Sequence, residues 1–190
     1  MTLRLVKSLF AFVVVLGAGL ALAVTPAASA AALVLDWQVI GTGTGAPNGC
    51  AVTTGGATCI FSGNATGDHV GRSTYVINII AGDTIPGLNG SGGECALSSG
   101  TGNVTAADGS KVNFNTVGLL CEEGALGTPI HYNGTYRICS PATTPGCPTS
   151  AGGRFSDAVG GGNLAATTTQ PFSTPSPPVS FIKIDGTINF

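Results

Sequence analysis

The few titratable side chains of this 190-residue chain are where chemistry would have to arise. Glu122 and Glu123 follow Cys121, and Glu94 precedes Cys95. A disulfide between these two cysteines would bring the carboxylates together, and a carboxylate pair performs acid–base or glycosidase chemistry when one pKa is raised. The same oxygens could hold Ca²⁺, although no D-x-D-x-D-G loop is present. The alternative, which we favour, is that they are solvated loop charges.

The two histidines of the chain are His69 and His131. Asp68 precedes His69, so this imidazole could serve as a general base. No G-x-S-x-G elbow is present, and residue counts alone do not define a Ser-His-Asp triad. We therefore interpret both histidines as structural or surface residues, and we assign neither a catalytic residue nor a cofactor.

Cysteine is the most informative residue type in this chain. An even number of cysteines in an exported chain indicates disulfides, although sequence alone cannot choose the pairing. No C-x-x-C pair occurs and both histidines are distant in sequence from any cysteine, so we predict no zinc or other metal site. We expect neighbours to pair, as Cys50–Cys59, Cys95–Cys121 and Cys139–Cys147.

The amino-terminal residues predict export. Arg4 and Lys7 precede an uncharged apolar run over residues 9–24, and Ala28 to Ala30 (Ala-Ser-Ala) form a small-residue cleavage site. This order is typical of a secretory signal peptide, and its alanine-rich style is of the bacterial kind. A membrane anchor is the alternative, but glycines and a proline interrupt the run, which is barely long enough to span a bilayer.

We therefore divide the chain into a cleaved signal peptide, residues 1–30, and a secreted domain, residues 31–190. The second part has the length of one domain with a substantial core. Its five basic residues face nine acidic ones and form no basic patch, which excludes nucleic acid as a partner. After signal cleavage, no feature favours membrane association.

Short β-prone runs between turn signals predict an all-β sandwich or barrel. Asp108-Gly109 is a strong hairpin signal. In the last run Ile182, Ile184 and Ile188 share a face with Gly186, which is the alternation of an antiparallel strand with one wet face. The expected β segments are 33–40, 50–61, 72–81, 103–107, 110–120, 129–138, 164–169 and 179–190, of which 50–61 is expected to be a hairpin that turns at Gly55-Gly56.

Two further patterns could carry a ligand. Residues 41–46 (GTGTGA) follow the first run and imitate a dinucleotide-binding turn, but no helical pattern follows, so we expect a flexible loop there. Strand aromatics could stack on a glycan or line a barrel that holds an apolar ligand, although such residues are more often core. The aromatic residues in question are Trp37, Tyr75, Tyr132 and Tyr136.

Four segments in order resemble a group of small secreted bacterial β-proteins of unassigned function. They are GDHVGRST at 67–74, VTAADGSK at 104–111, GGRFSDAVGGG at 152–162 and IDGTINF at 184–190. The G-R-F turn followed by a final strand is also similar to the barrel of allene oxide cyclases and dirigent proteins. This resemblance implies a single closed antiparallel barrel of about eight strands and no particular chemistry. The loop 139–147 is an insertion relative to the family pattern, and the resemblance does not cover the segment 41–66.

The turn motif of that family consists here of Gly152, Gly153, Arg154 and Phe155. The glycines permit a tight reversal, and Phe155 can enter the core after it. We expect Arg154 to pair with a carboxylate such as Asp157 or to stack on an aromatic ring.

These observations lead to a functional hypothesis. Few titratable groups, no catalytic motif and many cross-links favour a non-enzymatic secreted barrel that serves as an extracellular or envelope structural or binding module. One alternative is a barrel that binds or converts a small apolar molecule, as the cyclase resemblance implies. A second is a small outer-membrane barrel, which the low aromatic content and the cysteines fit poorly.

Overall fold

The structure of the chain is a computed structural model, and its barrel belongs to the unit Ala32–Phe190. The predicted signal peptide, Cys50, Glu123 and Phe190 lie outside the described residues. Those residues are 33–45, 57–86, 94–122, 129–139, 147, 152–168 and 179–189.

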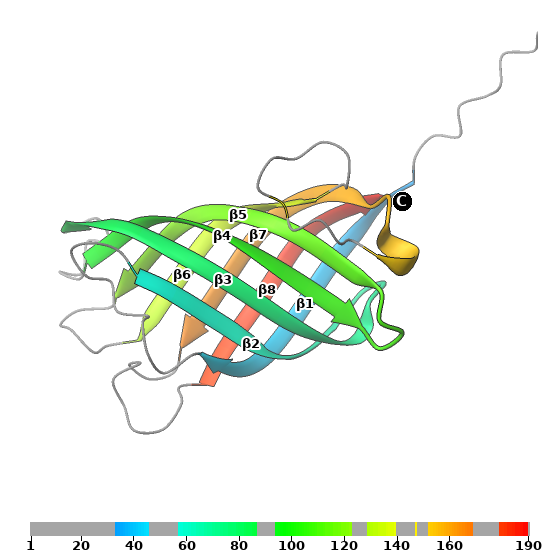
Figure 1. Cartoon of the computed structure of the whole chain (residues 1–190), viewed down its shortest axis with the longest axis horizontal. Helices are drawn as coiled ribbons and strands as arrows, with labels where there is room; N and C mark the ends of the chain where they lie inside the picture. The colour runs from blue at the N-terminus through cyan, green and yellow to red at the C-terminus, as the bar shows by residue number, and fades with distance from the viewer. Residues whose placement is uncertain are drawn as a thin grey trace, which may run out of the picture. The chain divides into compact units, whose positions relative to one another are not determined.

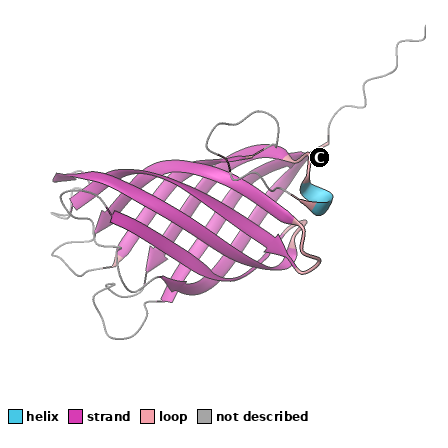
Figure 2. Ribbon diagram, viewed as in Figure 1, coloured by secondary structure: helices cyan, strands magenta, loops and turns pink. Residues whose placement is uncertain are grey.

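Eight strands form a closed barrel in which each strand pairs antiparallel with the next and β8 closes on β1 (Figure 1). This confirms the predicted fold class. In the described part of the chain the other regular element is a short 3-10 helix, η1 (Gly153–Phe155), at one end of the barrel (Figure 2). The strands are β1 (Val34–Gly45), β2 (Ala57–Gly67), β3 (Gly71–Pro86), β4 (Glu94–Ala106), β5 (Lys111–Glu122), β6 (Ile130–Ile138), β7 (Val159–Thr168) and β8 (Val179–Asn189).

Side chains alternate between the barrel interior and the outer wall, as the two-residue period of a strand requires. In β8 the inward residues Ile182, Ile184 and Ile188 are buried, and the outward residues Lys183 and Asp185 are exposed, as the sequence predicts. Inward positions of the other strands are also mainly apolar. Because an eight-stranded barrel is just wide enough for side chains to fill, these residues make the core.

Glycines inside the barrel give the aromatic rings their space. A Cβ added to Gly41 would lie 2.7 Å from Cε1 of Tyr75, and one added to Gly186 would lie 2.6 Å from the hydroxyl of Tyr136. Gly134 faces the Tyr132 hydroxyl and Gly102 faces the Phe114 ring in the same way. Each of these rings therefore occupies volume that a neighbouring side chain would otherwise fill.

The prediction of a flexible loop at residues 41–46 is wrong for residues 41–45. β1 continues through Gly41 and Gly43 to Gly45 and pairs with β2 over this stretch, with Gly43 opposite Gly63. A Cβ at Gly43 would overlap the backbone of Ser62. These glycines allow close backbone approach within the wall. The segment that follows them, residues 46–56, lies outside the described residues.

Two of the three predicted disulfides are present among the described residues. Cys95 and Cys121 are register neighbours on β4 and β5, and their bond cross-links the two strands. Cys139 is bonded to Cys147 just after β6. Cys59 is also disulfide-bonded, and its predicted partner Cys50 lies outside the described residues.

The core placement of Tyr75, Tyr132 and Tyr136 predicts an unusual alkaline titration. Burial raises the pKa of all three phenols. The negative charge of Asp185 raises the pKa of Tyr136 further. Hydrogen bonds with the hydroxyls of Ser180 and Thr116 partly offset the rise at Tyr75 and Tyr132. A raised folded pKa means that the neutral phenols stabilise the fold fully below the unfolded value of about 10. That contribution is lost as the pH rises through the folded values.

Since the chain has only these three tyrosines, we expect no tyrosinate absorbance near pH 10 until the barrel unfolds. Absorbance at the tyrosinate band and fluorescence of the single, fully buried Trp37 should therefore change together. Protein unfolded in denaturant is the control and should titrate near pH 10. Tyrosinate that forms near pH 10 while Trp37 keeps its native emission would contradict this prediction.

Candidate functional site

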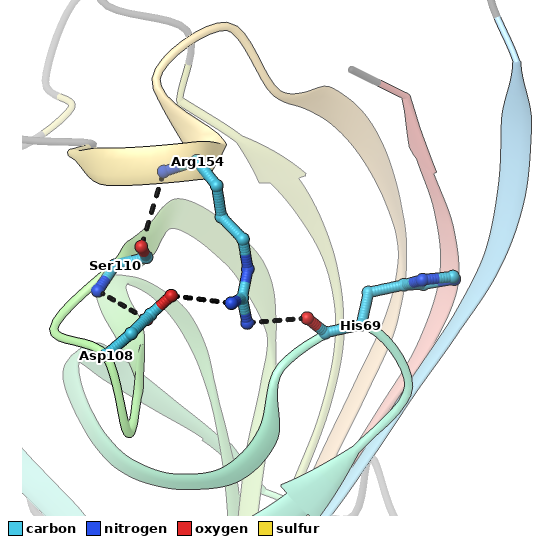
Figure 3. A network of polar contacts seen from close by, with 4 residues as sticks. All are labelled: His69, Asp108, Ser110 and Arg154. Atoms are coloured by element: carbon cyan, nitrogen blue, oxygen red, sulfur yellow. Dashed lines mark hydrogen bonds and ion pairs between the residues drawn. The ribbon is translucent and has the colours of Figure 1, made fainter.

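Three turns meet at the barrel end that carries η1 (Figure 3). The β2–β3 turn contributes His69, the β4–β5 turn contributes Asp108 and Ser110, and η1 contributes Arg154. We call these four residues the barrel-end cluster. His69 has a positive φ of 62°, and the hairpin glycine Gly109 has a φ of 83°, so both turns are tight reversals.

Arg154 holds the three turns together. Its guanidinium donates from Nη1 to a carboxylate oxygen of Asp108 at 2.6 Å and from Nη2 to the carbonyl of His69 at 2.8 Å. Its backbone amide donates to the Ser110 hydroxyl at 3.3 Å. The planar fork of donors suits arginine to two acceptors on different loops.

The sequence-based expectation for the partner of Arg154 is wrong in one respect. The carboxylate is that of Asp108 and not that of Asp157, whose contact is a long one to Ser156. The Asp108 carboxylate is oriented toward Arg154 because its other oxygen accepts a hydrogen bond from the Ser110 amide at 3.0 Å. The expected aromatic contact is present, since the guanidinium lies 4.8 Å from the ring centroid of Phe155.

Phe155 closes the interior at this end. Its side chain is 1% exposed and joins the hydrophobic core, although η1 itself lies outside the strands. A bridge between Lys111 and Gly152 anchors the start of the turn to β5. The G-R-F turn thus supplies the buried ring of Phe155 and the guanidinium of Arg154, which ties this turn to the two neighbouring turns.

Three of the segments that the sequence singles out meet in the barrel-end cluster. Segments 67–74, 104–111 and 152–162 contribute one or more residues each to this cluster. The arrangement is structural, because the hydrogen bonds of Arg154 join η1 to both hairpin turns and the His69 ring lies 3.2 Å from the Asp36 carbonyl of β1. The sequence indicates the turn motif, but the partners of Arg154 lie 46 and 85 residues away and carry no local signal.

The pH dependence of stability should report the Asp108 contact. Hydrogen bonds from Ser110 and the positive charge of Arg154 lower the pKa of Asp108 below its ordinary value of 3.8. A lowered folded pKa stabilises the fold above the unfolded value, and the contribution disappears as the pH falls through the folded value. Asp108→Asn should therefore lower the urea midpoint at pH 6, and the difference from the unmodified protein should vanish in more acidic solution.

Asp157→Asn is the matched control, because it removes a carboxylate from the same end of the barrel without touching Arg154. Its urea midpoint should follow that of the unmodified protein across this pH range. An equal pH-dependent loss in both variants would show that the effect comes from net charge and not from the ion pair.

The other polar residues that the sequence singles out do not form one site. Glu94 begins β4 and Glu122 ends β5, so both lie beside the Cys95–Cys121 disulfide. The expectation of a solvated loop charge is wrong for Glu122, which ends a strand and has a buried side chain, whereas Glu123 lies outside the described residues. His69 is at the opposite end of these strands.

His131 and the strand aromatics have structural surroundings. His131 lies on β6, where Nδ1 is 3.0 Å from the Thr167 hydroxyl. Within the described ranges no group of three His, Cys, Asp or Glu side chains could hold a metal ion. In the same residues no helix has the length and hydrophobicity needed to cross a bilayer. The four strand aromatics belong to the core and are therefore not presented to a glycan at the surface.

The outer wall of β3, β4 and β5 carries a second feature. Ile80, Leu97 and Val117 point outward and are 59%, 64% and 61% exposed. With Leu119 they line a groove of about 650 Å³. Leu97 is the register partner of Leu119, and Ser99 lies between Ile80 and Val117. Four aliphatic side chains therefore form one patch on three adjacent strands.

A second groove of about 510 Å³, less apolar than the first, continues this patch toward β6 and shares Ile80, Ser99 and Val117 with it. Its polar side chains come from register neighbours, because Thr101 pairs with Asn78 and with Asn115, and Asn115 pairs with Arg137. We call the two together the outer groove. It is apolar at one end and carries hydrogen-bond donors and one guanidinium at the other.

Comparison with known proteins gives no further assignment, since no family model, curated protein or solved structure matches this chain.

Proposed function

We propose that this protein is exported and acts outside the cytoplasm as a non-enzymatic barrel module whose outer wall makes its contacts. The observation that carries this proposal is the filled interior. Aromatic rings packed over glycines occupy the barrel core, and η1 adds Phe155 at one end. This packing directs the proposal to the outer wall and away from a ligand or reaction inside the barrel.

The disulfides support an oxidising location. Disulfides persist in extracellular and periplasmic proteins and are rare in the reducing cytosol. All cysteines in the described residues are bonded, including Cys59. Residues 1–30 carry the predicted signal peptide. Protein recovered outside the producing cell is therefore expected to begin at Ala31 and to contain no free thiol.

The polarity of the barrel supports an aqueous site of action. Inward positions are mainly apolar, and outward positions are mostly Asn, Thr and Ser, with a few charges and several exposed apolar side chains such as Ile40, Val76 and Phe181. A transmembrane barrel instead presents an apolar band to lipid and commonly has a polar interior. The module we propose is accordingly a water-exposed one.

A turnover screen tests the non-enzymatic assignment. Purified protein should show no hydrolase or isomerase activity toward ester, glycoside and epoxide substrates. Activity that Glu122→Gln or His69→Ala abolishes, with the fold intact by circular dichroism, would overturn the proposal. Activity that persists in both variants and separates from the protein on a second column would come from a contaminant. Activity that persists and stays with the protein would also overturn the proposal.

A further inference from the structure

The outer groove combines two features that a ligand would have to match. Its aliphatic end exposes Ile80, Leu97 and Val117 on adjacent strands, next to the polar side chains of the same groove. Contiguous apolar surface of this kind, rimmed by polar residues, marks interaction sites on soluble proteins. The patch lies on paired strands of the barrel, and an irregularity in the β3–β4 register between Ala81 and Thr84 borders it.

The opposite end of the groove is cationic. Arg137 is the one charged side chain among the described residues that line it. No acidic side chain in the described part of the chain forms an ion pair with Arg137. The amides of Asn78 and Asn115 and the hydroxyls of Thr101 and Thr135 lie along the same groove and add neutral donors.

We propose that the outer groove binds a single-chain amphiphile with a carboxylate head, such as a medium-chain fatty acid. The alkyl chain would lie on the aliphatic patch, and the carboxylate would pair with Arg137, whose planar fork matches a carboxylate. This inference rests on the proposed function, because it names a ligand for the outer wall.

The dimensions of the groove agree with such a ligand. Leu119 and Asn115 are four residues apart on β5, which is roughly 13 Å at about 3.3 Å per residue. Arg137 is on the next strand, roughly 4.8 Å farther across the sheet. A chain of medium length would therefore reach from the aliphatic patch to the guanidinium.

Other occupants fit less well. A peptide cannot add as a strand to these positions, because β3, β4, β5 and β6 are each paired on both sides within the closed barrel. A stable dimer uses roughly 20–30 residues on each side, which is far more than four aliphatic side chains offer. The described lining holds no Trp, Phe or exposed tyrosine ring on which a sugar could stack.

Calorimetric titration with octanoate, decanoate and dodecanoate below their micelle-forming concentrations tests the proposal. We expect one site per chain and an affinity that rises about two- to fourfold with each added methylene. Arg137→Gln should weaken decanoate binding roughly tenfold and leave decanol binding unchanged, because only the carboxylate uses the charge. Leu97→Asn and Val117→Asn should abolish binding of both ligands.

Two variants outside the groove serve as matched controls. Ile40→Asn replaces an aliphatic residue of β1 that is 54% exposed, and Lys183→Gln removes an outward cation of β8. Both should bind decanoate as the unmodified protein does. All of the replaced groove residues face solvent, so urea unfolding should show that the groove variants keep the stability of the fold.

The proposal is overturned if decanoate shows no saturable binding, or if the groove variants bind it as tightly as the controls do. It is also overturned if sedimentation shows a dimer that Val117→Asn dissociates, which would make this face a self-association surface. Binding to anionic lipid vesicles without binding to free decanoate would likewise replace it by a membrane surface. None of these results depends on turnover. The turnover screen therefore tests the proposed non-enzymatic function separately from ligand binding in the outer groove.

Discussion

Replacing Phe155 with alanine is expected to lower the free energy of unfolding by about 3–5 kcal/mol. The ring is 1% exposed and is the large apolar group that η1 contributes to the core. Its loss leaves a void at the end of the barrel. The turn cannot collapse into this void, because Arg154 remains tied to Asp108 and to the His69 carbonyl. Urea unfolding followed by Trp37 fluorescence measures the change.

Phe181→Ala provides the matched control for this prediction. Phe181 lies on β8 and is 47% exposed, so its removal should change the free energy of unfolding by well under about 1 kcal/mol. Phe155→Leu should fall between the two, since it retains part of the buried volume. Equal losses for Phe155→Ala and Phe181→Ala would show that the G-R-F turn is not part of the core.

The sequence predicts the barrel because its strongest signals are local. Asp108-Gly109 favours a tight hairpin turn, and Gly109 adopts the positive φ that this turn requires. The alternation of Ile182, Ile184 and Ile188 with charged residues predicts the inward face of β8, and those isoleucines are buried. Such patterns depend on a few neighbouring residues and can be interpreted without knowledge of the fold.

The extent of the strands could not be predicted in the same way. β1 and β7 are longer than expected because they contain Gly41, Gly43 and residues 160–162, which resemble turn signals when considered alone. Their glycines are used for close approach to neighbouring backbone and to rings, which only the closed barrel creates. A local clue exists, since glycine at every second position of 41–45 alternates with threonine as strand residues do.

The candidate sites show the same limit. The G-R-F motif indicates that Arg154 is held by an acceptor, but the partner depends on which turns share a barrel end. Asp157 is nearer in sequence, and Asp108 is nearer in space. The outer groove is harder still to predict, because its aliphatic residues come from three strands and become neighbours only through the register.

Packing of rings over glycines leads to the second large effect. Gly102→Ala is expected to lower the free energy of unfolding by about 1–3 kcal/mol, which is the usual cost of overpacking a core. The new Cβ would lie 2.6 Å from Cε2 of Phe114 and 3.2 Å from Cγ1 of Ile77. The Phe114 ring cannot easily turn away, because it is fully buried and makes an edge contact with Tyr136 at 5.6 Å between centroids.

A second substitution that removes the obstructing ring separates this cause from a general effect of the glycine. Phe114→Leu alone should also destabilise the barrel, but the double variant Gly102→Ala with Phe114→Leu should be more stable than the sum of the two losses by about 1–2 kcal/mol. Gly152→Ala is the control, because its backbone is extended and its Cβ would meet nothing within 4 Å. Strict additivity in the double variant would contradict the packing argument. The barrel interior would then be less tightly packed than these contacts indicate. The reason for placing binding on the outer wall would be lost.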